Sequence, residues 1–432
     1  MSGLTGSRRN RRGTVAAVTL VGLATALAAC LSTSASAATS PVSAIPASAF
    51  RDHTGITPTT VSIANISTES AGLFTGAVVG TKAYAEYINS LGGINGRKLV
   101  VDASDDQFTG ALNKQLTEEA VQKDVGLVGG FSLEDSFGAT VLAANPGVPD
   151  ISQILDATTE ALPDTFSWDP SAGGWPLGPL AYFKKRFPKD VDHVGAMIAD
   201  EGSATTTWAG EKRAMAHLGY RVTYDQTYPV TQTDFTANAV AMKNAGVKIL
   251  FLEQMPENYA AAMIKALNQQ SFHPVVVFGG AAYSEALVPA SGGASAIDGA
   301  FMDQGTALYL GEDAAVLPAV KTFLAWVQKA SPGFSADYYT LSGWVSAEMF
   351  ADALRAAGKD PSRGSILEAL HKTTAFNAQY LVGTANPPAK QPTNCYVISE
   401  ITNGKFQRID DPPVSGPTHG YRCDLSYYHP AT

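Results

Sequence analysis

The stretch from Thr75 to Asp106 constrains the fold of this chain more than any other. Its first half carries apolar residues at the spacing of one helix face, namely Val79, Ala83, Tyr87 and Leu91. Gly92 and Gly93 follow, and they end the helix because glycine enters the left-handed conformation without a Cβ clash. The segment Lys98 to Val101 then has the composition of a strand. The stretch therefore predicts a helix, a tight turn and a strand.

A further strand, Thr60 to Ala64, is predicted just before this helix. Strand, helix and strand in that order form the beginning of an open α/β sheet. In such sheets, ligands bind at the carboxyl ends of the strands. We therefore expect the loop from Asn65 to Phe74, which is rich in Ser, Thr and Gly, to border a ligand site.

The alternation of strand and helix continues along the chain in two series. The first series ends at Asp169 to Gly178, where the sequence DPSAGGWPLG breaks the pattern. The second series runs on to Gly279-Gly280, and we expect Ala300 to Gln304 to be another crossing between the two halves. Helices and a β-hairpin with an Asn403-Gly404 turn complete the chain. The pattern predicts an α/β protein with two similar halves.

The N-terminus has the features of an export signal. Residues 1–30 contain four arginines and then an apolar run that is too short to span a bilayer comfortably. The end of this segment, Leu27 to Cys30, resembles a bacterial lipobox, in which the cysteine is lipidated; cleavage after Ala37 is the alternative. Residues 31–57 are rich in Ser, Thr, Ala and Pro and predict a flexible tether. We expect an exported protein, either lipid-anchored at the cell membrane or secreted.

Charge and cysteine content narrow the function further. The net charge of −9 becomes −13 without residues 1–30, which argues against nucleic-acid binding through phosphate neutralisation. Cys395 and Cys423 are the two cysteines that remain after the signal segment, and an even pair in an exported chain predicts a disulfide. The histidines are not spaced as metal ligands and no CxxC motif occurs, so we expect no metal and no cofactor.

The motif INSLGGINGRKLVVDASDD, at residues 88–106, resembles the signature of the leucine/isoleucine/valine-binding protein family. These are the type I periplasmic solute-binding proteins of ABC importers, and the resemblance extends over roughly residues 57–409. It implies two doubly wound, Rossmann-like α/β lobes joined by a three-crossing hinge that closes over the ligand. On this basis, the first lobe comprises residues 58–178 plus 304–375. The second lobe comprises residues 179–303 plus 376–432, with the hairpin and a C-terminal extension.

The resemblance also implies ligand contacts in both lobes. In the first lobe, it points to Ser132 after a glycine-rich strand, and to Ala157 and Thr158 beside the backbone of Asp156. In the second lobe, the step Pro256-Glu257 matches one in which the acid accepts a hydrogen bond from the ligand ammonium.

Two aromatic residues complete the expected site. Phe74 is the expected aromatic contact of the first loop, and Tyr283, which follows Gly279-Gly280, is expected to line the cleft. An aromatic residue that the family places after a second-lobe strand is missing here, because residues 200–205 read DEGSAT. Leucine itself is therefore not assumed to be the ligand.

These observations predict capture of a small molecule and its delivery to an ABC permease in the membrane. We expect a monomer that binds a carboxylate or an amino-acid-like ligand, of the amino acid, amide or aromatic acid class. Enzyme motifs of the GxSxG, HExxH and phosphate-loop types do not occur, and the nearby acids Glu253 and Glu257 have no evident partner. A sensor subunit of the same fold and an exported α/β hydrolase remain as alternatives. The expected site predicts that Ser132→Ala and Glu257→Ala weaken ligand-dependent thermal stabilisation.

Overall fold

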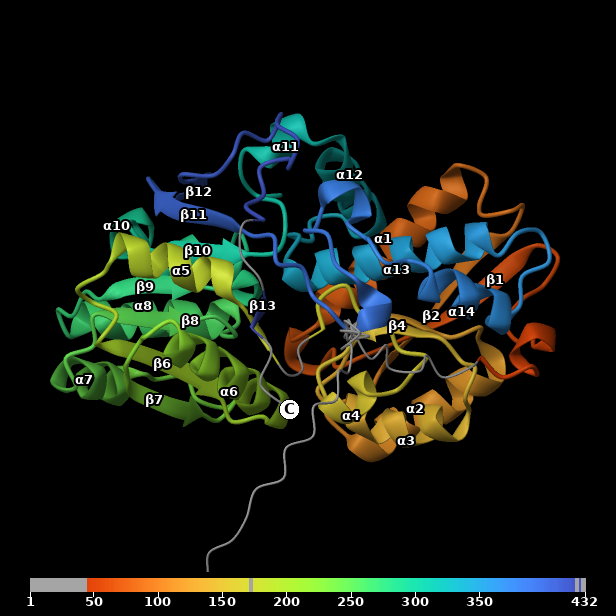
Figure 1. Cartoon of the computed structure of the whole chain (residues 1–432), viewed down its shortest axis with the longest axis horizontal. Helices are drawn as coiled ribbons and strands as arrows, with labels where there is room; N and C mark the ends of the chain where they lie inside the picture. Colours follow the sequence, from red (N-terminus) through yellow and green to blue (C-terminus); the bar gives the residue numbers. More distant parts are fainter. Residues whose placement is uncertain (1–44, 171–173, 424–426, 429–432) are drawn as a thin grey trace, which may run out of the picture. The chain divides into compact units, whose positions relative to one another are not determined.

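A computed structural model describes residues 45–170, 174–423, and 427 and 428. Cys30, and with it the predicted signal peptide and lipobox, lies outside these residues. The described chain forms two main β-sheets, each flanked by helices, which Figure 1 shows as two separate groups. The two-lobed α/β fold predicted from the sequence is confirmed.

The first lobe contains a parallel four-stranded sheet in the order β2-β1-β3-β4. Its strands are β1 (Thr60–Ser67), β2 (Lys98–Asp105), β3 (Leu127–Phe131) and β4 (Asp150–Gln153). Each strand is followed by a helix: α1 (Thr75–Ser90), α2 (Gly110–Lys123), α3 (Asp135–Ala144) and α4 (Ala157–Glu160). Because parallel strands are covered by helices on both faces, side chains such as Ile63 and Ile151 are fully buried.

Three later helices return to this lobe: α12 (Pro318–Ala330), α13 (Tyr338–Ala356) and α14 (Arg363–His371). Helix α13 is buried over almost its whole length and packs on α1, β3 and β4. The two helices approach closely because Gly80 of α1 has no side chain. A Cβ at Gly80 would lie 1.9 Å from the carbonyl oxygen of Thr340.

The motif that follows α1 has a structural role at the far end of α13. Gly92 and Gly93 have φ values of 103° and 78°, as a left-handed helix end requires. Asn95 then donates hydrogen bonds from Nδ2 to the carbonyl oxygens of Leu354 (3.1 Å) and Gly358 (2.7 Å). The motif therefore joins the opening unit to a helix that is distant in sequence.

The second lobe contains a seven-stranded sheet in the order β12-β11-β10-β9-β8-β6-β7. Its strands are β6 (Val194–Ala199), β7 (Val222–Tyr228), β8 (Ile249–Leu252), β9 (Val275–Phe278), β10 (Phe301–Gln304), β11 (Val397–Thr402) and β12 (Lys405–Arg408). The expectation of a crossing at residues 300–304 is wrong, because β10 pairs in parallel with β9 and antiparallel with β11. This short strand is buried on both faces and carries no alternating pattern that would have marked it.

The helices of the second lobe and the short helical turns complete the fold. They are α5 (Leu177–Arg186), α6 (Gly202–His217), α7 (Thr236–Asn244), α8 (Glu257–Gln269), α9 (Leu287–Ser291), α10 (Ala294–Ile297), α11 (Asp313–Val316), η1 (Ala49–Arg51), η2 (Ser70–Gly72), η3 (Gly280–Ala282), η4 (Ala378–Tyr380) and η5 (Pro387–Ala389). The chain passes between the lobes three times: after β4, after β10, and between α14 and β11. Within the described ranges, no helix combines the length and the hydropathy that a membrane span needs.

Residues 45–57, part of the predicted tether, are packed against the first lobe. The side chain of Arg363 donates to Asp52 Oδ2 (2.9 Å) and to the carbonyl oxygens of Val125 (3.0 Å) and Val121 (2.6 Å). Ala49 is buried in η1. The charge-assisted hydrogen bonds of Arg363 thus hold a segment whose composition alone indicated a flexible chain.

The predicted disulfide is present between Cys395 and Cys423. It ties the start of β11 to the C-terminal extension. The extension then forms β13 (Tyr427–Tyr428), which pairs antiparallel with β5 (Trp175–Pro176). The backbone of the C-terminal segment is thereby attached near the first crossing between the lobes.

Candidate functional site

A cavity of about 300 Å³ lies between the two sheets and is lined by both lobes. We call it the interlobe cavity. It is bordered by residues that include Phe74, Phe131, Leu155, Trp168, Asp169 and Tyr339 on one side, and Glu253, Gly279, Asp303 and Gln304 on the other. Most of these residues follow or end a strand, as expected for a ligand site in an open α/β sheet. A volume of this size accommodates a small organic molecule.

The first-lobe wall of the cavity is aromatic. The ring of Phe74 lies 4.5 Å from that of Phe131 and 4.8 Å from that of Tyr339, measured between centroids. Phe131 and Tyr339 meet edge to face at 4.9 Å. Phe131 ends β3 and Tyr339 lies in the first turn of α13, so the wall is assembled from elements far apart in sequence. This wall offers an apolar surface to a ligand.

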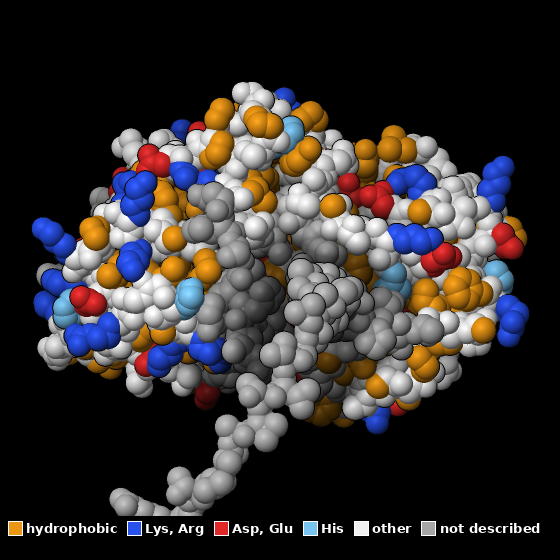
Figure 2. Space-filling view, in the orientation of Figure 1, with side chains coloured by type: hydrophobic (Ala, Val, Ile, Leu, Met, Phe, Trp, Pro, Cys, Tyr) orange, Lys and Arg blue, Asp and Glu red, His pale blue; other side chains and the backbone are white. Residues whose placement is uncertain are grey.

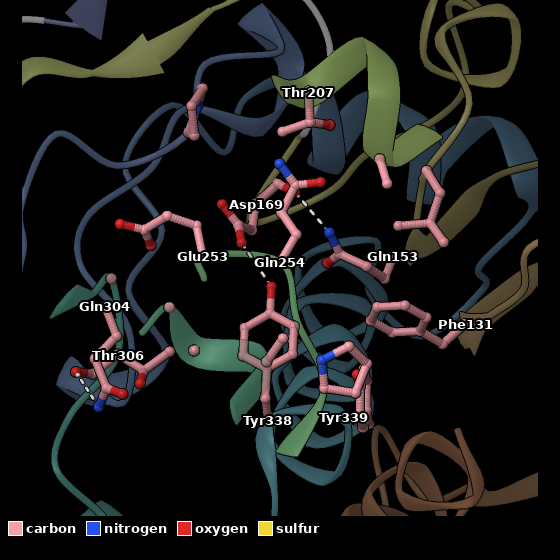
Figure 3. A pocket seen from close by; sticks show the side chains of 18 of the residues that line it. Phe131, Gln153, Asp169, Thr207, Glu253, Gln254, Gln304, Thr306, Tyr338 and Tyr339 are labelled. Atoms are coloured by element: carbon pink, nitrogen blue, oxygen red, sulfur yellow. Dashed lines mark hydrogen bonds between the residues drawn. The ribbon is translucent and has the colours of Figure 1, made fainter. Parts of the chain in front are cut away.

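Two hydrogen bonds connect residues that line the cavity on the first-lobe side. The hydroxyl of Tyr338 donates to Asp169 Oδ2 at 2.6 Å, and Gln153 Nε2 donates to the Asp169 carbonyl oxygen at 2.7 Å (Figure 3). Burial raises the pKa of Asp169, and the hydrogen bond from Tyr338 lowers it in part. These bonds fix the first crossing segment against β4 and α13.

The second-lobe wall contains two carboxyl groups that meet over a glycine. Leu252 and Met302 both pair with Phe278, so the next residues, Glu253, Gly279 and Asp303, lie in one row at the strand ends. A Cβ at Gly279 would lie 2.7 Å from Glu253 Oε2 and 2.1 Å from the Glu253 carbonyl oxygen. Glycine therefore leaves space for the carboxyl groups of Glu253 and Asp303, which influence the pKa values of each other.

A third acid, Glu211 of α6, lies behind this pair. Burial raises the pKa of Glu211 and of Glu253 well above the usual range for glutamate, and the neighbouring acids raise both further. Burial also raises the pKa of Asp303 to about 7. The cause is the cost of placing negative charges close together away from water. The cluster therefore retains protons at neutral pH.

Gln304 presents an acceptor on the same side of the cavity. Its Nε2 donates to the carbonyl oxygens of Ala307 (3.2 Å) and Thr306 (3.4 Å), while its Oε1 is buried and has no partner among the described residues. Because these bonds fix the orientation of the amide, the unpaired atom is an acceptor. Figure 3 shows Glu253 and Gln304 on one side of the cavity and Phe131 on the opposite side.

The described lining of the cavity contains acidic side chains and no basic ones. The described lining residues include four acids, Asp169, Glu201, Glu253 and Asp303, and no Lys, Arg or His. On the outer surface, by contrast, basic and acidic side chains are interspersed over the face seen in Figure 2. The interlobe cavity thus combines an apolar interior with hydrogen-bond acceptors and acidic groups.

Of the residues predicted to bind the ligand, Phe74 lines the interlobe cavity and Ser132 does not. Ser132 is buried, donates to Asp106 Oδ2, and accepts from Asn113 Nδ2 (3.1 Å) and the Glu134 amide (2.9 Å). Ser132 borders a separate space of about 30 Å³ within the first lobe. The sequence indicated a hydroxyl after a strand. It did not indicate that Asp106 accepts the hydrogen bond of this hydroxyl.

The remaining predicted contacts in the first lobe lie at an exposed turn. Asp156 caps α4, with Oδ1 accepting from the Thr158 amide at 2.7 Å, and Ala157 and Thr158 are exposed. None of these three residues lines the interlobe cavity. The neighbouring Leu155 does line it, one residue earlier in the chain.

The two predicted contacts in the second lobe are also not among the residues that line this cavity. Glu257 begins α8 and borders a different hollow, between α7 and α8. Tyr283 is buried in the core, where its hydroxyl accepts from the Leu310 amide at 3.0 Å and its ring packs on Tyr309 and Phe406. Its position after two glycines therefore did not indicate exposure to the cleft.

The sequence interpretation did not assign Glu253, Asp303 and Gln304 to the ligand site. A signal was available for Glu253, because an acid directly follows the buried strand sequence ILFL. Asp303 had a weaker signal, an acid within a short apolar segment that was not recognised as a strand. Within the described part of the chain, no group of three or more His, Cys, Asp or Glu side chains is arranged to hold a metal ion.

Comparison with known proteins agrees with this architecture. A family model described as periplasmic binding protein matches residues 61–405. The Leu/Ile/Val-binding protein homolog 3 of Brucella melitensis biotype 1 is 25% identical over 303 residues, which cover 68% of this chain and 77% of the relative.

Solved structures share the fold at lower identity. A branched-chain amino acid ABC transporter protein from Thermus thermophilus with bound valine has a TM-score of 0.70 and 15% identity, covering 81% of this chain and 95% of that one. A fatty acid ABC transporter substrate-binding protein from Thermomonospora curvata has a TM-score of 0.69 and 16% identity, covering 88% and 95%.

The match over most of the chain shows that this protein belongs to the periplasmic binding protein family, in its Leu/Ile/Val-binding, type I group. Members of this family are extracytoplasmic solute-binding proteins and not enzymes. The resemblance inferred from the residue 88–106 motif is confirmed.

Proposed function

We propose that this protein is the solute-binding component of an ABC importer, and that it captures its ligand in the interlobe cavity. The observation that carries the proposal is that both lobes line one cavity at the ends of their strands. Closure of the lobes around a molecule in this position removes the ligand from water and changes the surface offered to a permease. Capture and release, not catalysis, are then the chemical task of the chain.

The lining favours a ligand with an apolar body and an amine. Of the two classes expected from the sequence, a carboxylate and an amino-acid-like molecule, only the second carries a positively charged group. Phe74, Phe131 and Tyr339 provide the apolar surface. The acids of the lining pair with an ammonium when they ionise, whereas the described lining has no basic side chain to pair with a carboxylate. Anchoring at the membrane through Cys30, a monomeric state and delivery to a permease complete the proposal.

The experiment is a search for bound and binding molecules with the purified mature chain. Native mass spectrometry of fresh protein reports any ligand retained from the cell. A thermal-shift screen over amino acids, aromatic acids, amides and amines then tests which class raises the melting temperature. We expect at least one member of the screen to do so by several degrees. If no compound is retained and none shifts the melting temperature, the proposed function is wrong.

A further inference from the structure

The Glu253–Asp303 pair borders the ligand cavity, and no ion pair in the described chain gives it a role in stabilising the fold. Both residues line the interlobe cavity, and Glu253 Oε1 is buried without a hydrogen-bond partner in the described chain. The pair lies at the ends of β8 and β10, where only Gly279 separates the two side chains. An acidic pair that served stability alone would be expected to meet a buried cation, as Asp313 meets Arg408 elsewhere in this lobe.

Gln304 provides an independent observation that points to a ligand. It is 6% exposed, it lines the cavity, and its unpaired Oε1 is held as an acceptor by the two bonds of its Nε2. Buried polar atoms are rarely left without a partner. Together, Glu253, Asp303 and Gln304 form what we call the acceptor wall. Within the described chain, Gln304 Oε1 thus lacks a hydrogen-bond donor and Glu253 Oε1 lacks a partner.

The described lining of the cavity has no Lys, Arg or His to pair with a ligand carboxylate, and its unpaired donor group is the neutral hydroxyl of Tyr228. The described lining has no basic side chain, and Ser132, the hydroxyl expected to serve this purpose, is occupied by Asp106. The helix N-termini near the cavity already carry acids: Glu201 precedes α6, and Asp337 caps α13 by accepting from the Thr340 amide at 2.7 Å. These acids offset the positive ends of the helix dipoles.

We propose that the Glu253–Asp303 pair holds the ammonium group of a hydrophobic monoamine that has no free carboxylate. This inference rests on the proposed function and specifies its ligand. The amine nitrogen donates to the pair at the second-lobe edge, and Gln304 accepts a further N–H or O–H from the same molecule. The hydrocarbon or aromatic body lies against the wall formed by Phe74, Phe131 and Tyr339.

The protonation of the cluster sets the direction of a pH effect. Asp303 has three titratable neighbours. They are Glu253 at the end of β8, Glu211 of α6, and Tyr220, which precedes β7. Burial raises the pKa of Glu253, Glu211 and Asp303, and neighbouring acids raise the pKa of Glu253 and of Glu211 further, so the ligand-free pair retains protons near neutral pH. An ammonium favours the ionised pair, and its binding therefore releases protons to solvent.

The test uses three probes that share a phenylethyl group: 2-phenylethylamine, 2-phenylethanol and 3-phenylpropanoate. We expect the amine to raise the melting temperature of the mature chain most, the alcohol less, and the anion not at all. Phenylalanine, which adds a carboxylate to the amine, is expected to bind more weakly than 2-phenylethylamine. A larger shift with the anion or with phenylalanine, or no shift with the amine, overturns the inference.

A matched pair of variants locates the amine. Glu253→Gln keeps the shape of the side chain but removes a carboxyl group that ionises when the amine binds, and we expect it to weaken 2-phenylethylamine binding about 30-fold or more. Glu118→Gln makes the same change on the exposed surface of α2 and leaves binding unchanged. If Glu253→Gln retains the affinity of the native chain, the amine is not held by this pair.

A calorimetric measurement on the native chain serves if Glu253→Gln does not fold. Titration in buffers of different ionisation enthalpy counts the protons exchanged on binding. Release with 2-phenylethylamine supports the inference, and uptake or no exchange contradicts it. Binding of an anion or an amino acid with no amine binding overturns only this inference, whereas failure of every compound in the wider screen overturns the proposed function.

Discussion

The carboxyl groups of Glu253 and Asp303 meet over Gly279, although the two residues belong to strands that are not adjacent in the sheet. Strand β9 lies between β8 and β10, and any side chain at its carboxyl end would separate the two acids. The absence of a side chain at this one position creates the acidic edge of the interlobe cavity. The predictions below test this edge and the contacts that hold the lobes and the termini in place.

Gly279→Ala is expected to disrupt the acidic edge. The added Cβ would meet the Glu253 carbonyl oxygen at 2.1 Å, and backbone cannot move away as a flexible side chain can. We expect a loss of about 1–3 kcal/mol in the free energy of unfolding, together with loss of ligand-dependent stabilisation. Gly202→Ala, at the start of α6 and with no atom within 4 Å of the added Cβ, is the control and should be neutral or slightly stabilising. Equal effects of the two changes, measured by denaturant unfolding, would contradict this prediction.

The stability of the ligand-free protein should fall as the pH rises from about 4 to about 7. Burial raises the pKa of Asp303 to about 7, so the folded state binds a proton that the unfolded state has already lost. That contribution is fully present below the ordinary aspartate pKa and disappears as the pH passes the raised value. Asp303→Asn should flatten the slope by up to about 1.4 kcal/mol per pH unit in this window. Melting temperatures of both proteins across the window provide the check.

A part of this slope should remain in the variant. Burial also raises the pKa of Asp135 to about 7, and Asp135 is unaffected by the substitution. A slope that is unchanged or steeper in Asp303→Asn would show that Asp303 ionises at its ordinary pKa.

Two glutamates near the end of β8 give opposite expectations for ligand binding. Glu253 lines the interlobe cavity and Glu257 does not, so Glu253→Gln should lose the thermal shift caused by ligand while Glu257→Ala retains it. The sequence analysis predicted Glu257, and not Glu253, as a ligand contact. A thermal-shift titration of both variants with any ligand found in the screen decides between them. Loss of the shift only in Glu257→Ala would support the site expected from the sequence.

Removal of the disulfide should destabilise the C-terminal extension. Cys395 and Cys423 are separated by 28 residues, and closing a loop of this length contributes roughly 3–4 kcal/mol on the chain-entropy model. Replacement of both cysteines by serine should lower the unfolding free energy of the oxidised protein by up to that amount. A reducing agent should lower the stability of the native chain and leave the double variant unchanged. A native chain whose melting temperature is insensitive to reduction would argue against the bond.

Arg363→Lys is expected to weaken the contact between the N-terminal segment and the first lobe. Arg363 is 4% exposed and its guanidinium bonds to Asp52 and three backbone carbonyls, a geometry that one ammonium cannot reproduce. A loss of about 2–4 kcal/mol is expected because buried acceptors are left unpaired. Arg355→Lys is the control, since its pair with Asp352 is exposed and should change stability by less than about 0.5 kcal/mol. Urea denaturation of both variants is the measurement. Similar losses of stability in the two variants would contradict the proposed role of Arg363.

Local sequence patterns predicted the fold better than the site. The helix after Thr75, the left-handed turn at Gly92-Gly93 and the strand from Lys98 all depend on neighbouring residues, and all are present. Strand β10 was not predicted, because its four residues are all buried and carry no periodic signal. Asp303, which belongs to this strand, was therefore not assigned to the site. An error in one short element thus removed a residue of the candidate site.

The sequence by itself determined the two-lobed α/β fold, the family and the disulfide, because these follow from local spacing, from one extended motif and from a single available cysteine pair. Only the tertiary structure decided which polar groups face the cavity. That outcome depends on the register between β8, β9 and β10, which brings Glu253 and Asp303 together over Gly279. It also depends on competition for partners, because Asp106 accepts the hydrogen bond of Ser132 while Gln304 Oε1 has no partner among the described residues. Neither register nor competition is encoded within a few neighbouring residues, and both become visible only when distant strands are packed side by side.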